Sequence, residues 1–149
     1  MAVTFSAMTA EQQQRADHEP YIQAVCRSIE GRDVRVVAAG VTRFTRRVRR
    51  SQLTLRPELD AFAVAGPAQA TAAWDEESGW SLSVRRQSID YQVSKGLDVV
   101  PDPDDVAAWV VVALAHPELT PSYEDGPLRS HSVSDPEFDA RLARYAATS

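Results

Sequence analysis

The sequence predicts an α+β protein, in which helices cover one face of an antiparallel sheet of four to five strands. Three observations support this fold class. Apolar and polar residues alternate over residues 80–84 and again over 89–93, as is typical of half-buried strands. Apolar residues at i, i+3, i+4 and i+7 within 22–29 indicate an amphipathic helix. A long apolar run, 106–115, directly follows a strong helix-start pattern.

Segment 74–80 joins two of the predicted strands. It reads Trp-Asp-Glu-Glu-Ser-Gly-Trp, and Gly79 can adopt the positive φ angle that a short hairpin loop needs. The two tryptophans flank the loop and can fix the register of the strand pair. We expect the acidic residues 75–77 to lie at a solvent-facing loop tip. A weaker, alanine-rich strand precedes the loop at 70–74, so the region up to residue 93 predicts an antiparallel meander.

Further strands are predicted upstream of this meander. Alternation over 34–38 predicts a strand that is broken at Gly40, and alternation over 52–55 predicts another before Pro57. Residues 61–66 form a short apolar piece that fits either an edge strand or a packed loop. These pieces bring the predicted sheet to four or five strands.

Two helices, 20–30 and 103–116, are expected to cover one face of the sheet. The first has a proline in its first turn, where a helix tolerates it, and ends at Gly31. The second has Asp102 as its N-cap, followed by a proline and two aspartates in the positive first turn, and it stops at Pro117. Its three consecutive valines make a strand the competing interpretation, but the capping pattern and the length favour a helix.

A peripheral C-terminal helix is predicted at 135–147. It carries a stripe of Phe138, Leu142 and Tyr145, and follows a polar linker with two prolines and a glycine. Such a helix can pack on its own domain or on a neighbouring copy. The predicted organisation along the chain is a flexible or frayed N-terminal segment, an α+β domain, a linker and the C-terminal amphipathic helix, at residues 1–18, 19–117, 118–134 and 135–149.

The composition is that of a soluble protein of a reducing compartment. The chain has 149 residues, a net charge of −5 and 25% charged residues, all ordinary for one globular domain. Cys26 is the only cysteine, which excludes an internal disulfide framework and a multi-cysteine zinc site. Residues 1–9 lack the features of a signal peptide, and the longest apolar run is roughly half of a membrane span. We therefore expect a cytoplasmic protein without membrane contact.

The order of elements and the tryptophan-flanked hairpin at 74–80 carry a resemblance to a known group. Together they resemble a family of small actinobacterial α+β proteins of unknown function. The resemblance spans roughly Pro20 to Pro117 and is most specific at the hairpin; both ends of the chain and the arginine-rich segment lie outside it. It implies the fold and the compartment, and it supplies no catalytic residues.

A basic cluster is the feature of the sequence that most invites a functional hypothesis. Residues 43–56 hold six arginines and no acid, so the rest of the chain has a net charge of −11. Guanidinium groups suit phosphates and carboxylates, and their mutual repulsion is relieved by an acidic partner. The residues predicted to bind that partner are Arg43, Arg46, Arg47, Arg49 and Arg50.

Three interpretations of the cluster stay open. It can be a solvated loop or strand edge whose charges discourage edge pairing. It can bind an acidic protein surface, including the acidic face of a second copy in a homodimer. Nucleic acid ranks lower, because Phe44 is the only aromatic residue in the cluster, the net charge is acidic and no nucleic-acid motif is present.

Four aromatic residues form the second candidate site. We expect Trp74, Trp80, Tyr91 and Trp109 to cluster between the sheet and a helix, either as part of the core or as an aromatic-lined pocket for a small apolar ligand.

No residues are assigned to catalysis, a cofactor or a metal. The spacing of Asp102, Asp104 and Asp105 is explained by helix capping. Cys26 lies on an apolar stripe, and on one helix it would be about 12 Å from His18, too far for a nucleophile and its base. The sequence also has no phosphate-binding loop, nucleophile elbow or zinc-protease motif.

These observations favour a non-enzymatic cytoplasmic adaptor or regulatory protein that binds an acidic partner through the arginine-rich segment. One alternative is a small-molecule-binding protein or enzyme that uses the aromatic pocket. The other is nucleic-acid binding through the arginine cluster.

Overall fold

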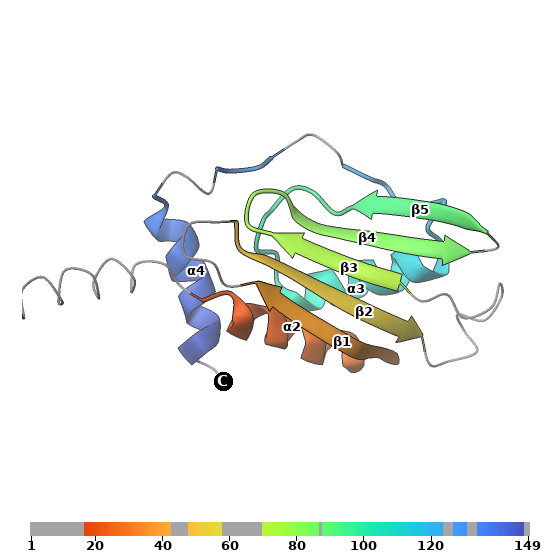
Figure 1. Ribbon diagram of the computed structural model, residues 1–149, viewed down its shortest axis with the longest axis horizontal. Helices are drawn as coiled ribbons and strands as arrows, with labels where there is room; N and C mark the ends of the chain where they lie inside the picture. The colour runs from red at the N-terminus through yellow and green to blue at the C-terminus, as the bar shows by residue number, and fades with distance from the viewer. Residues whose placement is uncertain are drawn as a thin grey trace, which may run out of the picture.

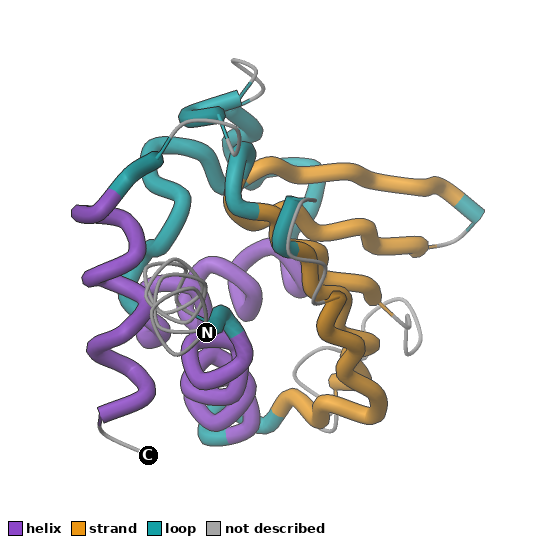
Figure 2. Tube along the Cα trace, turned by 60° about the vertical axis from the view of Figure 1, so that its left-hand side comes forward, coloured by secondary structure: helices purple, strands orange, loops and turns teal. Residues whose placement is uncertain are grey.

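The computed structural model describes residues 17–42, 48–57, 70–86, 88–123, 127–130 and 134–147. The elements in chain order are α2 (Glu19–Glu30), β1 (Val34–Thr42), β2 (Arg50–Pro57), β3 (Ala70–Asp75), β4 (Gly79–Arg86), β5 (Ile89–Ser94), α3 (Pro103–Ala115) and α4 (Pro136–Ala147). The strands form one sheet with the order β1-β2-β3-β4-β5, in which every neighbouring pair is antiparallel (Figure 1). The described helices gather on one side of this sheet (Figure 2). The α+β prediction is confirmed.

The hairpin between β3 and β4 forms as its sequence predicts. Trp74 pairs with Trp80, and Asp75 pairs with Gly79. The Asp75 carboxylate accepts hydrogen bonds from the backbone amides two and three residues further on, at 2.9 and 2.7 Å. Gly79 has a φ of +81°, and a Cβ there would lie 2.9 Å from the carbonyl oxygen of Asp98. Only glycine satisfies both the turn and this close approach.

Strand β1 is longer than the alternation in the sequence indicates. It continues through Gly40 to Thr42, and the pairing with β2 shifts by one residue between Val36 and Ala38. This bulge interrupts the alternation, so the second half of the strand does not show the expected pattern. Glycine is tolerated at this edge of the sheet. Residues 61–66, predicted as an edge strand or a packed loop, lie outside the described residues.

The core lies between the sheet and the helices. Helix α3 begins as predicted, because the Asp102 carboxylate accepts a hydrogen bond from the backbone N–H of Asp104 at 3.0 Å. Burial of each large apolar side chain contributes about 1.5–3 kcal/mol. The buried side chains of the helices and the sheet include Tyr21, Ile22, Val25, Ile29, Leu53, Leu55, Trp74, Trp80, Leu82, Val84, Val106, Val110, Leu114, Phe138 and Leu142.

Helix α4 packs on its own chain. Phe138 and Leu142 of the predicted stripe are buried in the core, and the third member, Tyr145, contacts the ring of Tyr21 in α2 at a centroid distance of 5.0 Å. The alternative of docking on a neighbouring copy is therefore not needed to cover this stripe. Among the described residues, no helix is both long and apolar enough to cross a membrane.

Candidate functional site

The structure separates the arginines of the predicted cluster. Arg43, Arg46 and Arg47 lie outside the described residues, whereas Arg49 and Arg50 lie at the start of β2. The Arg50 side chain is exposed, but Arg49 has only 6% of its surface exposed. Two neighbouring arginines therefore lie in opposite environments.

Arg49 pairs with Glu76 in an extension of the β2–β3 ladder. The N–H of Glu76 donates to the carbonyl oxygen of Arg49 at 3.1 Å, and the N–H of Arg49 donates to Oε2 of Glu76 at 2.7 Å. Nε of Arg49 lies 3.6 Å from the same oxygen. Glu76 is 1% exposed, which differs from the solvent-facing loop tip expected from the sequence. The reason is that residues 127–130 lie over the hairpin and cover Glu76.

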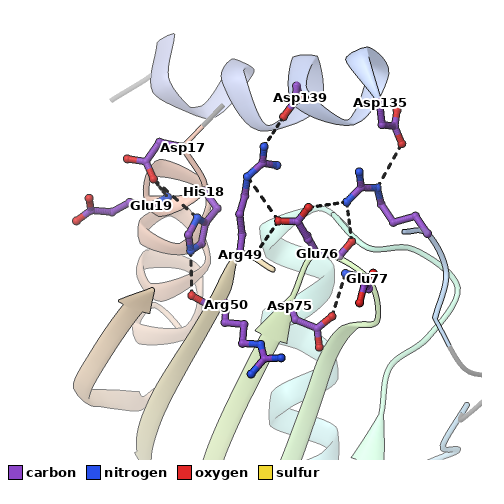
Figure 3. A network of polar contacts seen from close by, with 11 residues as sticks. Asp17, His18, Glu19, Arg49, Arg50, Asp75, Glu76, Glu77, Asp135 and Asp139 are labelled. Atoms are coloured by element: carbon purple, nitrogen blue, oxygen red, sulfur yellow. Dashed lines mark hydrogen bonds and ion pairs between the residues drawn. The ribbon is translucent and has the colours of Figure 1, made fainter. Parts of the chain in front are cut away.

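Arg129 is the second cation on Glu76. Its Nη1 donates to Oε1 of Glu76 at 3.0 Å and to the carbonyl oxygen of the same residue at 3.1 Å. Its Nε donates to Asp135 at 3.3 Å, and Nη2 of Arg49 donates to Asp139 of α4 at 2.8 Å (Figure 3). The two oxygens of the Glu76 carboxylate thus face two different arginines, one on each side.

Phe138 of α4 lies beneath both guanidinium groups. Its ring centroid is 5.5 Å from Cζ of Arg49 and 4.0 Å from Cζ of Arg129, and each contact of this kind is worth about 0.5–1 kcal/mol or more. We call the residues joined in this way the Glu76 cluster: Arg49, Glu76, Arg129, Asp135, Phe138 and Asp139. The cluster fastens α4 and residues 127–130 to one end of the sheet, and its buried charges are matched by opposite charges.

Two tryptophans of the second candidate site, Trp74 and Trp80, are core residues that hydrogen-bond to a loop and to Tyr21. Nε1 of Trp80 donates to the Tyr21 hydroxyl at 3.0 Å, and that hydroxyl donates to the carbonyl oxygen of Pro101 at 2.7 Å. Nε1 of Trp74 donates to the carbonyl oxygen of Val99 at 2.6 Å. Burial raises the pKa of Tyr21 well above its usual value, so the hydroxyl stays neutral and can donate.

The structure does not bring all four predicted aromatic residues into ring contact. Trp74 and Trp80 are each 1% exposed, and both contact the ring of Tyr21, at centroid distances of 5.9 and 6.3 Å. Tyr91 and Trp109 are partly buried and pack against the outside of the same core. Sequence reasoning missed Tyr21, although it stands four residues before Val25 on the buried face of α2.

His18 lies next to these rings. It is 1% exposed, stacks on Trp74 at a centroid distance of 5.4 Å, and donates from Nε2 to the carbonyl oxygen of Arg50 at 2.9 Å. Burial lowers the pKa of His18 below its usual value, despite the nearby carboxylate of Asp17. The residue therefore joins α2 to the start of β2.

Comparison with known protein families places the chain in one of them. Residues 21–112, more than half of the chain, match a family of unknown function, DUF6292. The chain belongs to this family. It matches none of the curated proteins and none of the solved structures.

The family match covers only part of the Glu76 cluster. The matched range contains Arg49 and Glu76, and it includes the arginine-rich segment that sequence reasoning left outside the resemblance. Arg129, Asp135 and Asp139 come from chain beyond the match. In this member of DUF6292, the matched range is thus joined by ion pairs to the chain that follows it.

Three features of the described part of this DUF6292 chain bear on its chemistry: the thiol of Cys26, the grouping of metal-ligand residue types and a groove among the helices. Burial raises the pKa of Cys26 to about 11, so its thiol is not a nucleophile at neutral pH. No three His, Cys, Asp or Glu side chains of the described residues lie together as metal ligands. A groove of about 450 Å³ between α2, α3 and α4 is lined by Ala24, Arg27, Ser28, Asp102, Pro103, Asp104 and Tyr145, and none of the four predicted aromatic residues lines it.

Proposed function

We propose that this DUF6292 protein is a non-enzymatic cytoplasmic adaptor or regulator that binds an acidic partner through the arginine-rich side of its sheet. The proposal rests on the uneven distribution of charged residues in this protein. Residues 32–56, which contain β1 and β2, hold eight arginines and one acid, a net charge of +7, whereas the whole chain has a net charge of −5. Because β1 and β2 pair with each other at one edge of the sheet, their exposed arginines, Arg35, Arg50 and Arg56, lie on neighbouring strands.

Cationic side chains occur at both ends of this strand pair. Arg35 of β1 and Arg56 of β2 are exposed cross-strand partners at one end. At the other end, Arg50 is exposed and opposite Thr42, where the chain enters segment 43–47. An acidic partner would be attracted by the positive charge of this strand pair.

The burial of Arg49 removes one residue from the set that we propose to bind the partner. Arg49 is buried and bonded to Glu76 and Asp139, so we assign it an anchoring role. The binding set is then Arg43, Arg46, Arg47 and Arg50. We further propose that the tryptophan-flanked hairpin is the characteristic element of the family and that the family is actinobacterial, as the resemblance implied.

The exposed positions of β2 to β5 favour a protein partner over nucleic acid. Single-stranded nucleic acids bind sheets through aromatic side chains on which the bases stack. The described positions that alternate with the core residues on these strands carry no aromatic side chain: Arg50, Gln52, Thr54, Arg56, Thr71, Ala73, Asp75, Ser81, Ser83, Arg85, Asp90, Gln92 and Ser94.

Affinity capture from the native cell lysate tests the proposal. The variant carries Arg46→Ser, Arg47→Ser and Arg50→Ser and keeps the buried Arg49. The control carries Arg27→Ser, Arg85→Ser and Arg144→Ser, which removes the same charge from three exposed positions elsewhere. We expect the variant to lose a protein that the wild type and the control both capture, with unchanged melting temperatures.

Two results would contradict this expectation. If the variant still captures the partner, the arginine-rich segment does not bind it. If nuclease treatment releases the captured material, and capture weakens steeply with salt, the ligand is a nucleic acid.

A further inference from the structure

We propose that the surface under α4 is a binding site for an amphipathic helix of a protein partner, and that α4 is the occupant that this helix displaces. The helix that fits has a carboxylate in its first turn and an apolar stripe, like α4 itself. The inference goes beyond the proposed function, because it concerns a different surface and uses none of the four arginines that we propose to bind the acidic partner.

The surface under α4 lies within the range matched by the family, whereas α4 lies beyond it. Helix α4 packs beside α2 at one end of the sheet (Figure 1). We call the residues that contact it there the α4-binding surface: Tyr21, Arg49, Asp98 and Val100. The family match therefore includes this surface without the helix that covers it.

Helix α4 buries fewer side chains than the helices within the match. Among its described side chains it buries Phe138 and Leu142, whereas α2 buries four and α3 buries five. Its opposite face is exposed at Glu137, Ala140 and Arg144. An element with few buried apolar contacts opens at a lower free energy than the whole protein unfolds. Helix α4 is therefore the described helix that leaves most readily while the rest stays folded.

Polar contacts of α4 define the chemistry that the surface accepts. Asp139, in the first turn, accepts from Nη2 of the buried Arg49 at 2.8 Å. Nη2 of Arg141 donates to the Asp98 carboxylate at 2.6 Å and to the carbonyl oxygen of Val100 at 2.7 Å. The Asp98 side chain is 41% exposed, so its ion pair adds little to stability. These contacts select a helix with an acid in its first turn, and apolar burial supplies most of the affinity.

One donor of the α4-binding surface is not satisfied by α4. Nη1 of Arg49 is buried and has no hydrogen-bond partner within the described part of the chain, although Arg49 is only 6% exposed. A buried donor without an acceptor costs free energy. A carboxylate that bridges both terminal nitrogens of a guanidinium forms a stronger, bidentate pair. A partner helix with glutamate where α4 has Asp139 reaches one methylene further and can form that pair.

Hydrogen exchange of the full-length protein tests whether α4 leaves its surface. We expect the amides of α4 to exchange at least about tenfold faster than those of α3, β3 and β4, because α4 opens while the rest stays folded. The indole N–H groups of Trp74 and Trp80, bonded to Val99 and Tyr21, should stay protected during this opening. If α4 exchanges only together with these indoles, the surface is never free and the inference is wrong.

Synthetic peptides test which helix the surface accepts. The probe has the sequence of residues 134–147, and its match carries Phe138→Ala and Leu142→Ala. We expect the full-length chain with Leu142→Ala to bind the probe at least about tenfold more tightly than the wild type, because its own α4 competes less. Arg141→Ala weakens α4 without a cavity in the core and should also favour the probe. The match should bind to neither variant.

A second probe with Asp139→Glu tests the unsatisfied donor of Arg49. One added hydrogen bond to a charged group makes its binding about tenfold tighter than that of the first probe. Equal or weaker binding would show that α4 already fits best and would overturn displacement by a partner. Failure of both variants to bind either probe would also overturn the inference. A wild-type protein that sediments as a dimer with exchanged α4 helices would assign the surface to a second copy instead.

Discussion

Arg49 and Arg50 are neighbours in the chain with opposite surroundings, and the contrast separates two uses of arginine in this protein. Arg49 points toward α4 and bonds to the carboxylates of Glu76 and Asp139, whereas the Arg50 side chain points away from that helix (Figure 3). Residues that follow one another in an extended chain face opposite sides. One arginine therefore lies in the Glu76 cluster, and the other faces solvent beside β1.

The two regions also differ in how their charges are balanced. In the Glu76 cluster, two arginines face three carboxylates, of Glu76, Asp135 and Asp139, within about hydrogen-bonding distance. In the β1–β2 region, seven arginines besides Arg49 accompany a single acid over residues 32–56. A count of charges along the sequence does not distinguish these two regions. Burial and the positions of the carboxylates show that Arg49 belongs to the Glu76 cluster.

The largest expected effect on the free energy of unfolding is that of substituting Arg49. Arg49→Ala leaves the buried carboxylate of Glu76 with one cation fewer, and breaking a buried pair costs about 3–5 kcal/mol. Arg50→Ala removes an exposed side chain and should change the free energy of unfolding by less than about 0.5 kcal/mol. Urea denaturation of both variants measures the difference. Equal effects of the two substitutions would show that Arg49 is not part of a stabilising cluster.

A smaller effect is expected where α4 joins the cluster. Asp139→Asn keeps the shape of the side chain but removes the charge that accepts from Arg49 at 2.8 Å. A hydrogen bond to a charged group is worth about 1.5–3 kcal/mol, so we expect a loss near the lower value because Asp139 is partly exposed.

Glu137→Gln is the matched control for this substitution, because it removes a carboxylate from an exposed position of the same helix. We expect it to be close to neutral in the same urea titration. A double variant, Arg49→Ala with Asp139→Asn, should lose less than the sum of the single losses. Additive losses would show that the two residues do not stabilise each other.

The local parts of this fold are readable from the sequence. The alternation in 80–84, the hairpin glycine and the Asp102 cap each depend on residues close together in the chain, and each formed as predicted. The strand predicted from the alternation in 89–93 also formed, but only Val93 of its apolar residues is buried and Ile89 is 53% exposed. The extension of β1 past Gly40 was missed because a bulge shifts the register, and a bulge leaves no periodic signal.

The Glu76 cluster could not be predicted, because its members are far apart in the sequence. Arg129 is 53 residues from Glu76 and comes from a stretch whose composition resembles a solvated linker. A carboxylate in a hairpin loop is usually exposed, so nothing near Glu76 signals its burial. The burial of Tyr21 could have been predicted, because the residue lies on the apolar face of α2. Its hydrogen bonds to Trp80 and Pro101 could not, because those residues are brought close only by the fold.

The smallest expected effect concerns His18, which bonds to the backbone of the exposed Arg50 while lying close to Arg49 and Glu76. Burial lowers its pKa in the folded protein, so the unfolded chain takes up a proton first as the pH falls below about 6.5. The contribution of His18 to stability is therefore complete above that pH and is lost progressively below it, by at most about 1.4 kcal/mol per pH unit.

Urea titrations between about pH 5 and pH 8 measure this effect, with His18→Gln and His116→Gln compared with the wild type. Glutamine can still donate to the Arg50 carbonyl but does not titrate, so the stability of the His18 variant should fall less on acidification than that of the wild type. His116 is exposed, and its variant should follow the wild type. If all three curves run parallel, His18 titrates alike in the folded and unfolded chain, and its burial against Trp74 does not oppose the charged form.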